Sequence, residues 1–243
     1  MDKEQGSQGN SRGTIDPIGP RELRIMNSRA RELLLRYWDF PIFASLLRSR
    51  RLSLENAIVL DVGCGSGYTT LLISETFSPR RLDAFDVVPG QVELARSRGI
   101  DANIFVADIV DPRLPEHSYD AVFICGVLHH CPEWRTGLSR VAHLLRDGGV
   151  LLIEEPGSRH IKLETVLMGR PPADGAWTGL EPFRDEVASA GLSIVEERPI
   201  YFGLFGSFLC VKAAEARERD HIVARHLLRT PAGDVVTGQE VPA

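Results

Sequence analysis

The sequence has few of the features that mark secreted, membrane-spanning or disulfide-bonded proteins. It contains only four cysteines, with neither a CxxC pair nor the spacing of a disulfide framework. No apolar run approaches the roughly 18 residues that a membrane-spanning helix needs. Residues 1–19 are polar and lack the apolar segment of a signal peptide or anchor. We therefore expect a reduced, cytoplasmic protein without integral membrane association.

Basic residues are fewer than acidic ones, so the chain carries a net charge of -5 at pH 7. Binding to nucleic acid phosphates favours a basic face, so this balance argues against a nucleic-acid partner. Apolar residues are not scarce: they make up 43% of the 243 residues, enough to build the core of one large domain.

Short apolar runs alternate with helical patterns from residue 57 onward. The runs predict buried strands at 57–62, 81–86, 102–106, 119–125 and 150–154, with helices at 66–76, 89–98 and 132–146. This alternation predicts parallel strands joined by right-handed crossovers, which is a doubly wound α/β fold. Two more strands are predicted at 192–199 and 205–212, after a helix at 181–190. The loop between these strands is too short for a parallel crossover, so the last strand of the mostly parallel seven-stranded sheet should be antiparallel.

The remaining segments differ from this alternating pattern. Residues 1–19 predict a disordered leader, and 20–52 an amphipathic helical cover ahead of the main domain at 53–213. The apolar face of this cover is expected to consist of Leu33, Leu34, Tyr37, Trp38, Phe43, Leu46 and Leu47. Residues 155–180 form an insertion that is too long for an ordinary loop, and such insertions are often functional or mobile. We expect the insertion and the N-terminal helices to cover a binding site. Residues 214–243 predict a charged helix followed by a disordered tail.

A glycine-rich turn follows the first predicted strand. In "VLDVGCGSG", Gly63, Gly65 and Gly67 alternate after Asp61. The spacing does not match the G-x-G-x-x-G fingerprint of dinucleotide-binding proteins. Ligands in such sheets bind outside the carboxyl ends of the strands, and glycine allows a close backbone approach there.

Two further acidic residues follow the next predicted strands. Asp86 ends the second strand, where a carboxylate can accept hydrogen bonds from both hydroxyls of a ribose. Asp108 follows the third strand, in position to accept from an adenine amino group. Each is also the kind of residue that begins an ordinary turn.

Taken together, these stretches resemble class I S-adenosylmethionine-dependent methyltransferases of the small-molecule type. The matching segments are "VLDVGCGSG", "AFDVVPGQVELAR", "VADI", "SYDAVFICGVLHHCPEW" and "LSRVAHLLRDGGVLLIEEP", in the order and spacing of the family. The resemblance covers about two-thirds of the chain and leaves out the N-terminal helices, the 155–180 insertion and the tail. It implies S-adenosylmethionine as the cofactor and methyl transfer as the activity.

The resemblance assigns cofactor-binding roles to ten residues. The methionine part of the cofactor would face Asp61, Gly63 and Gly65, with Gly67 opening the adjacent helix. Asp86 would hold the ribose. The adenine would lie against Val87, Asp108 and Ile109, and the pocket near the sulfonium would be lined by Cys125 and Gly126.

The catalytic candidates are His129 and His130, which follow the fourth predicted strand next to the expected position of the methyl group. Histidine titrates in the range that suits a general base. Either residue could instead only shape the pocket, and we expect this of His130. Glu154, Glu155 and His160 are further candidates, and no metal site is expected, since adjacent residues rarely converge on one ion.

The acceptor is not identified by the sequence. The end of the fourth strand lacks the N-P-P-Y type of sequence found in methyltransferases that act on the exocyclic amines of nucleic acids. This favours transfer to an O, N or C atom of a small molecule, with a secondary metabolite, a lipid and a quinone-like compound among the candidates. The alternatives are an inactive binding partner with the same fold, and a relative that uses the cofactor for another reaction. The oligomeric state stays open, a homodimer included.

Overall fold

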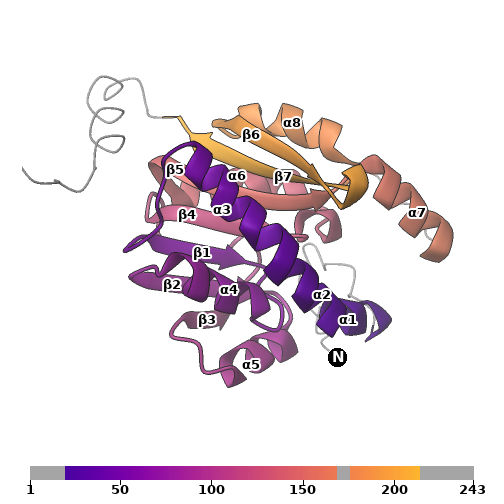
Figure 1. Ribbon diagram of the computed structural model, residues 1–243, viewed down its shortest axis with the longest axis horizontal. Coiled ribbons are helices and arrows are strands. Elements are labelled where there is room, and N and C mark those ends of the chain that lie inside the picture. The colour runs from indigo at the N-terminus through magenta and orange to yellow at the C-terminus, as the bar shows by residue number, and fades with distance from the viewer. Residues whose placement is uncertain (1–19, 169–175, 214–243) are drawn as a thin grey trace, which may run out of the picture.

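A seven-stranded sheet with helices on both faces forms the centre of the computed structural model, which describes residues 20–168 and 176–213 (Figure 1). The strand order is β3-β2-β1-β4-β5-β7-β6. All neighbouring pairs are parallel except the two that involve β7. The strands are β1 (Ile58–Val62), β2 (Arg81–Asp86), β3 (Asn103–Val106), β4 (Tyr119–Cys125), β5 (Leu145–Pro156), β6 (Leu192–Ile200) and β7 (Phe205–Lys212). The predicted fold class is confirmed, including the antiparallel last strand.

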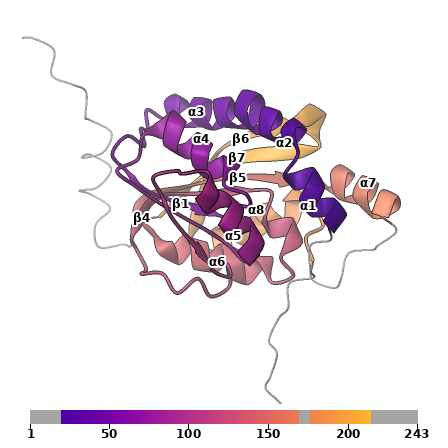
Figure 2. The same cartoon turned by 90° about the horizontal axis from the view of Figure 1, so that it is seen from below.

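The helices lie in two layers with the sheet between them, and Figure 2 shows α3 and α4 on the opposite side from α6. Helices α3 (Phe40–Ser49) and α4 (Tyr68–Phe77) bury an aromatic cluster in which Phe40 stacks on Phe123 of β4. Helices α6 (Trp134–Leu144) and α8 (Leu180–Ser189) cover the other face, where Trp134 meets the buried Trp177 edge to face. Helix α5 (Pro89–Ser97) packs on β2 and β3. Both faces of the sheet are therefore covered, as its continuous apolar strands require.

The N-terminal residues are helical as predicted, and part of the predicted apolar face is buried, namely Phe43, Leu46 and Leu47. They form α1 (Pro20–Met26), α2 (Arg29–Leu34), a π-helical segment η1 (Leu35–Asp39) and α3. The sequence pattern placed Leu33, Leu34, Tyr37 and Trp38 on the apolar face, and all four are exposed. Helix α3 supplies most of the buried side chains, so this part of the predicted cover belongs to the core.

Two predicted helix boundaries differ from the structure by two residues each. The helix predicted over 132–146 ends at Leu144, because Leu145 already pairs with Tyr119 as the first residue of β5. A bulge then separates this pair from the regular ladder, and Gly148, with a φ of 71°, lies in the irregular stretch. Gly148 and Gly149 therefore lie in a strand irregularity, and the helix ends before them. The helix predicted from residue 66 begins at Tyr68.

The 155–180 insertion is partly regular structure. Glu155 and Pro156 continue β5, and α7 (Ser158–Met168) follows and projects beyond the body of the sheet (Figure 1). Trp177 is buried and donates its indole N–H to the Pro156 carbonyl, so it is a core residue. Residues 1–19 and 214–243, predicted as leader and tail, lie outside the described residues, as do 169–175 of the insertion. None of the described helices has both the length and the apolar character to cross a membrane.

Candidate functional site

The three glycines of the β1 turn have positive φ angles but serve different purposes. A Cβ atom on Gly63 would meet the Val127 side chain at 2.5 Å, and one on Gly67 would meet the Ala95 backbone at 2.8 Å. A Cβ on Gly65 would have no protein atom within 4 Å. Only Gly65 therefore faces open space, while the other two permit close packing against the β4 loop and α5.

Asp86 connects this turn to the end of β2. One carboxylate oxygen accepts the Gly65 N–H at 2.9 Å, and the other accepts the Val88 N–H at 2.8 Å. The residue is 8% exposed, and burial raises the pKa of its carboxyl group, although these backbone bonds oppose the shift. Asp86 thus fixes the turn next to its open side, and each oxygen retains lone-pair capacity for a ligand hydroxyl.

Asp61 lies beneath the turn and is fully buried. Its Oδ2 accepts hydrogen bonds from the hydroxyls of Thr69 and Thr70 at 2.6 and 2.7 Å, which ties β1 to the first turn of α4. Oδ1 has no hydrogen-bond partner among the described residues. Burial raises the pKa of Asp61 to about 6. An unpartnered buried oxygen and the open side of Gly65 are two features that fit a bound amino-acid group at this place.

One pocket collects several of the predicted residues at the carboxyl ends of β1, β2 and β4, and we call it the β1–β4 pocket. Six predicted residues line it: Gly63, Asp86, Val87, Ile109, Gly126 and His130. Six do not: Asp61, Gly65, Gly67, Asp108, Cys125 and His129. Met26 of α1 and Cys131 also line it, and the sequence patterns gave no signal for either. The assignment of these residues to a cofactor stays a prediction.

Asp108 and Cys125 lie outside this pocket for separate reasons. Asp108 Oδ1 accepts the Val110 N–H at 3.0 Å and forms an ordinary Asx turn after β3. Cys125 packs with the aromatic cluster on the α3 and α4 face of the sheet, and burial raises the pKa of its thiol. Cys125 pairs with Glu154 in the β4–β5 ladder, and its predicted place near the sulfonium stays a prediction.

His129 is held by Glu155. Its ring Nδ1 lies 2.8 Å from Glu155 Oε2, while Glu155 Oε1 accepts the backbone N–H groups of Val127 and Leu128. Burial lowers the pKa of His129 to about 3, so the ring is neutral at pH 7, with Nδ1–H donating to the carboxylate. Burial also raises the pKa of Glu155, to about 7. This pair shapes the loop after β4, and a histidine that resists protonation is a weak general base.

A polar group that we call the Arg31 cluster lies beside this loop and consists of Arg31, Asp39, Glu154 and Tyr201. Asp39 and Glu154 are fully buried, while Arg31 and Tyr201 are half-buried. Arg31 bonds to Glu154 at 2.9 Å and to Asp39 at 3.4 Å, and the Tyr201 hydroxyl donates to Asp39 at 2.7 Å. Burial raises the pKa of Asp39 to about 7, with a further contribution from the Glu154 charge. Of this cluster, only Glu154 was a candidate from the sequence. The others lie on the N-terminal helices or after β6, outside the stretches that carry the family resemblance.

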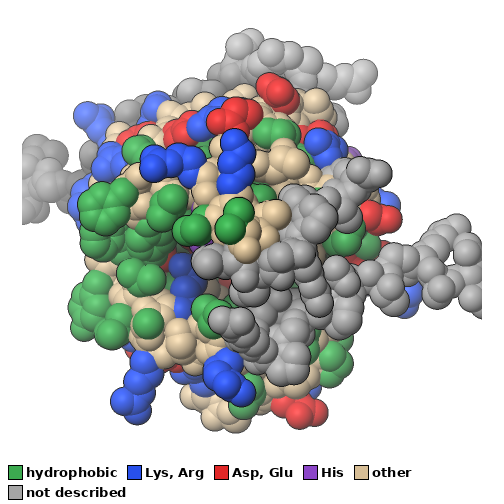
Figure 3. Space-filling view, turned by 90° about the vertical axis from the view of Figure 1, so that its right-hand side faces the viewer, with side chains coloured by type: hydrophobic (Ala, Val, Ile, Leu, Met, Phe, Trp, Pro, Cys, Tyr) green, Lys and Arg blue, Asp and Glu red, His purple; other side chains and the backbone are tan. Residues whose placement is uncertain are grey.

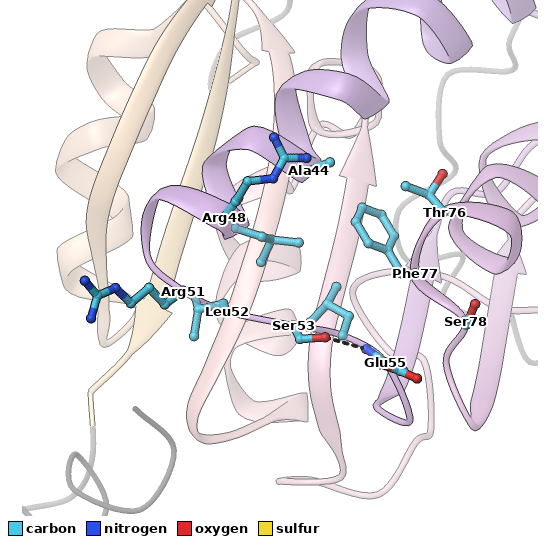
Figure 4. A pocket seen from close by; sticks show the side chains of 11 residues that line it. Ala44, Arg48, Arg51, Leu52, Ser53, Glu55, Thr76, Phe77 and Ser78 are labelled. Carbon is cyan, nitrogen blue, oxygen red and sulfur yellow. Dashed lines mark hydrogen bonds between the residues drawn. The ribbon is translucent and has the colours of Figure 1, made fainter. Parts of the chain in front are cut away.

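A second hollow, of about 500 Å³, lies between α3, α4 and the segment before β1 (Figure 4). It is lined by Arg48, Arg51, Glu55, Phe77 and their neighbours. This is the amino end of β1, opposite the edge where ligands bind in such sheets. No group of three or more His, Cys, Asp or Glu residues in 20–168 and 176–213 is arranged to hold a metal ion.

Comparison with known proteins agrees with this geometry. Residues 59–149 match the family described as methyltransferase domain. The chain is 35% identical over 112 residues to the ubiquinone biosynthesis O-methyltransferase of Xylella fastidiosa (strain M23), covering 43% of this chain and 44% of the relative. It is 29% identical over 147 residues to the trans-aconitate 2-methyltransferase of Methylobacterium radiotolerans, covering 60% and 55%. The chain thus spans about half the length of these curated relatives.

A solved structure shows the same fold over a longer stretch. The S-adenosylmethionine-dependent methyltransferase of Clostridium acetobutylicum superposes with a TM-score of 0.63 at 14% identity, covering 80% of this chain and 98% of that one. The sheet order and the glycine turn agree with this match, and the fold is that of class I S-adenosylmethionine-dependent methyltransferases. Its centre is the matched segment, residues 59–149.

Proposed function

We propose that this protein transfers a methyl group from S-adenosylmethionine to an O, N or C atom of a small molecule. The observation that carries the proposal is Asp86 at the end of β2. Its carboxylate accepts the N–H of Gly65, the one glycine of the turn that faces open space. Ribose hydroxyls need such a carboxylate, and the unpartnered Asp61 oxygen offers an acceptor for the cofactor's ammonium group. The matching relatives, which carry names of small-molecule methyltransferases, support the same class of acceptor.

The residues around the pocket have distinct parts in this proposal. The cofactor, when bound, supplies an electrophilic methyl group on a sulfonium. Val87 and Ile109 offer apolar surface to an adenine ring at the β2 and β3 ends of the pocket. Gly126 leaves room beside the loop that Glu155 and His129 hold. Methyl transfer is an in-line displacement, so the main contribution of these residues is to fix the reacting atoms in position.

The test is to incubate the protein with S-adenosylmethionine and a collection of small-molecule acceptors and to measure S-adenosylhomocysteine. Product above the background without acceptor would support the proposal, and Asp86→Ala should remove it. Cofactor binding with no product from any acceptor class would favour an inactive binding partner or another reaction. Absence of cofactor binding would exclude the proposal.

The acceptor, location and assembly are further parts of the proposal. A secondary metabolite is one candidate class of acceptor. From the net negative charge and the composition we also propose a cytoplasmic location and no nucleic-acid partner. Light scattering after size-exclusion chromatography distinguishes a monomer from a homodimer.

A further inference from the structure

The two glutamates that end β5 point to opposite faces of the sheet. Leu152 packs in the cluster with Phe40 on the α3 face, and Ile153 packs in the cluster with Trp134 on the α6 face. By this alternation, Glu154 faces the N-terminal helices and Glu155 faces the α6 side. Glu155 accepts hydrogen bonds from the backbone N–H groups of residues 127–129 in the loop after β4. Glu154 has only one of its two oxygens engaged, by Arg31.

The second carboxylate oxygen of Glu154, Oε1, is buried and accepts no hydrogen bond from the described residues. The Glu154 side chain is 0% exposed. An unpaired buried carboxylate oxygen is costly, so such an atom calls for an explanation. A ligand that donates a hydrogen bond would satisfy it.

Glu154 lies next to the place where the methyl group is expected. A Cβ atom on Gly126 would be 3.8 Å from Glu154 Oε2 and 3.6 Å from both Arg31 Nη2 and His129 Cε1. Gly126 itself lines the β1–β4 pocket. Arg31, His129 and Glu154 therefore lie next to Gly126 without lining the pocket themselves, and strands β1 and β4 separate Glu154 on β5 from Asp86 on β2.

The charge of the Arg31 cluster selects among acceptors. Two carboxylates, Asp39 and Glu154, share the single guanidinium of Arg31, and both side chains are fully buried. The raised pKa of Asp39, which burial and the Glu154 charge produce, agrees with an excess of negative charge. A second anion would be repelled there, whereas a neutral or cationic hydrogen-bond donor would be attracted.

We propose that the Arg31 cluster is the acceptor end of the site, where Glu154 receives the proton of a neutral O–H or N–H nucleophile. This inference rests on the proposed function. In the step, the nucleophilic oxygen or nitrogen forms a bond to the methyl carbon, and the carbon–sulfur bond breaks with its electron pair going to sulfur. The O–H or N–H bond breaks, its electrons stay on the acceptor atom, and the proton goes to the Glu154 carboxylate. Carboxylate acceptors are excluded.

The first test is a binding measurement that does not depend on knowing the acceptor. Sinefungin carries an amine where S-adenosylmethionine carries its methyl sulfonium, and S-adenosylhomocysteine carries neither group. We expect Glu154→Gln to weaken sinefungin binding about tenfold or more, as for a lost charged hydrogen bond, and to leave S-adenosylhomocysteine binding within about twofold. Calorimetry on the full chain measures both.

The matched control is Glu75→Gln, because Glu75 also pairs with an arginine of the N-terminal helices, Arg36, but on the surface. It should change neither affinity. If Glu154→Gln weakens the binding of both ligands equally, Glu154 either contacts the methionine part of the cofactor or has a purely structural role, and the inference fails. If the affinity for neither ligand changes, the inference fails as well. If the native chain binds neither ligand, the proposed function fails, and this inference with it.

The second test is product analysis by mass spectrometry after incubation with phenols, aromatic amines and aromatic carboxylates as separate probe sets. We expect methyl ethers or methylamines and no methyl esters. Ethers without amines, or the reverse, would identify the nucleophile within the proposed class. Methyl esters as the main product would overturn the proposal, even if the methyltransferase activity itself is confirmed.

Discussion

At the scale of single residues, the glycine turn shows that one motif can combine folding and binding requirements. Gly67 is needed because the Ala95 backbone would lie 2.8 Å from any Cβ at that position. Gly65 has no such neighbour, and its N–H is bonded to Asp86. Gly67 therefore serves the packing of α4 against α5, whereas Gly65 faces open space where we propose that the ligand binds.

This difference predicts separate effects of two alanine substitutions. Both impose a positive φ on alanine, at a cost of about 1–2 kcal/mol. Gly67→Ala adds a clash with backbone and should lower the free energy of unfolding by more than Gly65→Ala does. Gly65→Ala should weaken S-adenosylhomocysteine binding by more than its stability loss explains. Denaturant titration and calorimetry measure the two effects, and an equal loss of stability would contradict this assignment.

His129 gives the second prediction at this scale. The unfolded chain protonates a histidine near pH 6.5, whereas the buried His129 resists protonation until about pH 3. Lowering the pH through this window therefore favours the unfolded state, which takes up the extra proton. His129→Asn keeps an N–H for Glu155 but does not titrate, so its stability should fall less on acidification than that of the native chain.

The same variant tests catalysis. A general base contributes about 10²–10⁴-fold, so a loss of turnover below about tenfold in His129→Asn would agree with a shaping role. An acidic limb of the pH–rate profile that vanishes in the variant would instead show that His129 is the base. Unfolding must be followed in both proteins over the same pH range to interpret the rates.

At the scale of secondary-structure elements, the N-terminal helices divide into two parts with different packing. Helix α3 buries Phe40, Phe43, Leu46 and Leu47, while α2 has no buried residue. Helix α1 contributes Met26 to the β1–β4 pocket. In Figure 3, which faces the right-hand side of Figure 1, exposed hydrophobic side chains lie among basic ones. Local stability should therefore differ sharply between 20–34 and 40–49.

Hydrogen exchange should reveal this difference. We expect slow exchange in α3 without any ligand, and faster exchange in α1 and α2 that slows when S-adenosylhomocysteine binds, because Met26 contacts the pocket. The α4 amides serve as an internal reference. Unchanged exchange of 20–34 on ligand binding, in a protein that calorimetry shows to be saturated, would exclude a covering role for these helices.

The sequence predicted the sheet well because each strand is a local apolar run, and the order of elements allows few topologies. It failed in η1, where the π-helical turn takes more residues than an α-helical one and shifts the phase of the pattern. Leu35 and Asp39 therefore turn inward, while Tyr37 and Trp38 turn outward. Asp39 then meets Tyr201, 162 residues away, in a contact that no local pattern contains. For the same reason, the Arg31 cluster could not be predicted.

At the scale of the whole molecule, the candidate site joins segments from most of the described chain. The β1–β4 pocket extends from Met26 to Cys131, and the Arg31 cluster adds Glu154 and Tyr201. The fold places these residues at one edge because the parallel strands all end there. A ligand at this edge contacts several elements at once and should stabilise the folded chain as a unit.

Thermal unfolding therefore tests the whole arrangement. A ligand at 100 times its dissociation constant stabilises the folded state by about 2.7 kcal/mol. For a domain of this size, that corresponds to a rise of about 5–10 °C in the melting temperature. We expect this shift with S-adenosylhomocysteine. If Asp86→Ala weakens binding tenfold, the same concentration stabilises by about 1.4 kcal/mol, and the shift should be roughly halved. Glu154→Gln should keep the full shift, since its partner is the acceptor, whatever its own melting temperature. If the rise in melting temperature with S-adenosylhomocysteine is lost in Glu154→Gln and kept in Asp86→Ala, the assignment is reversed. Glu154 would then bind the cofactor, and Asp86 would not.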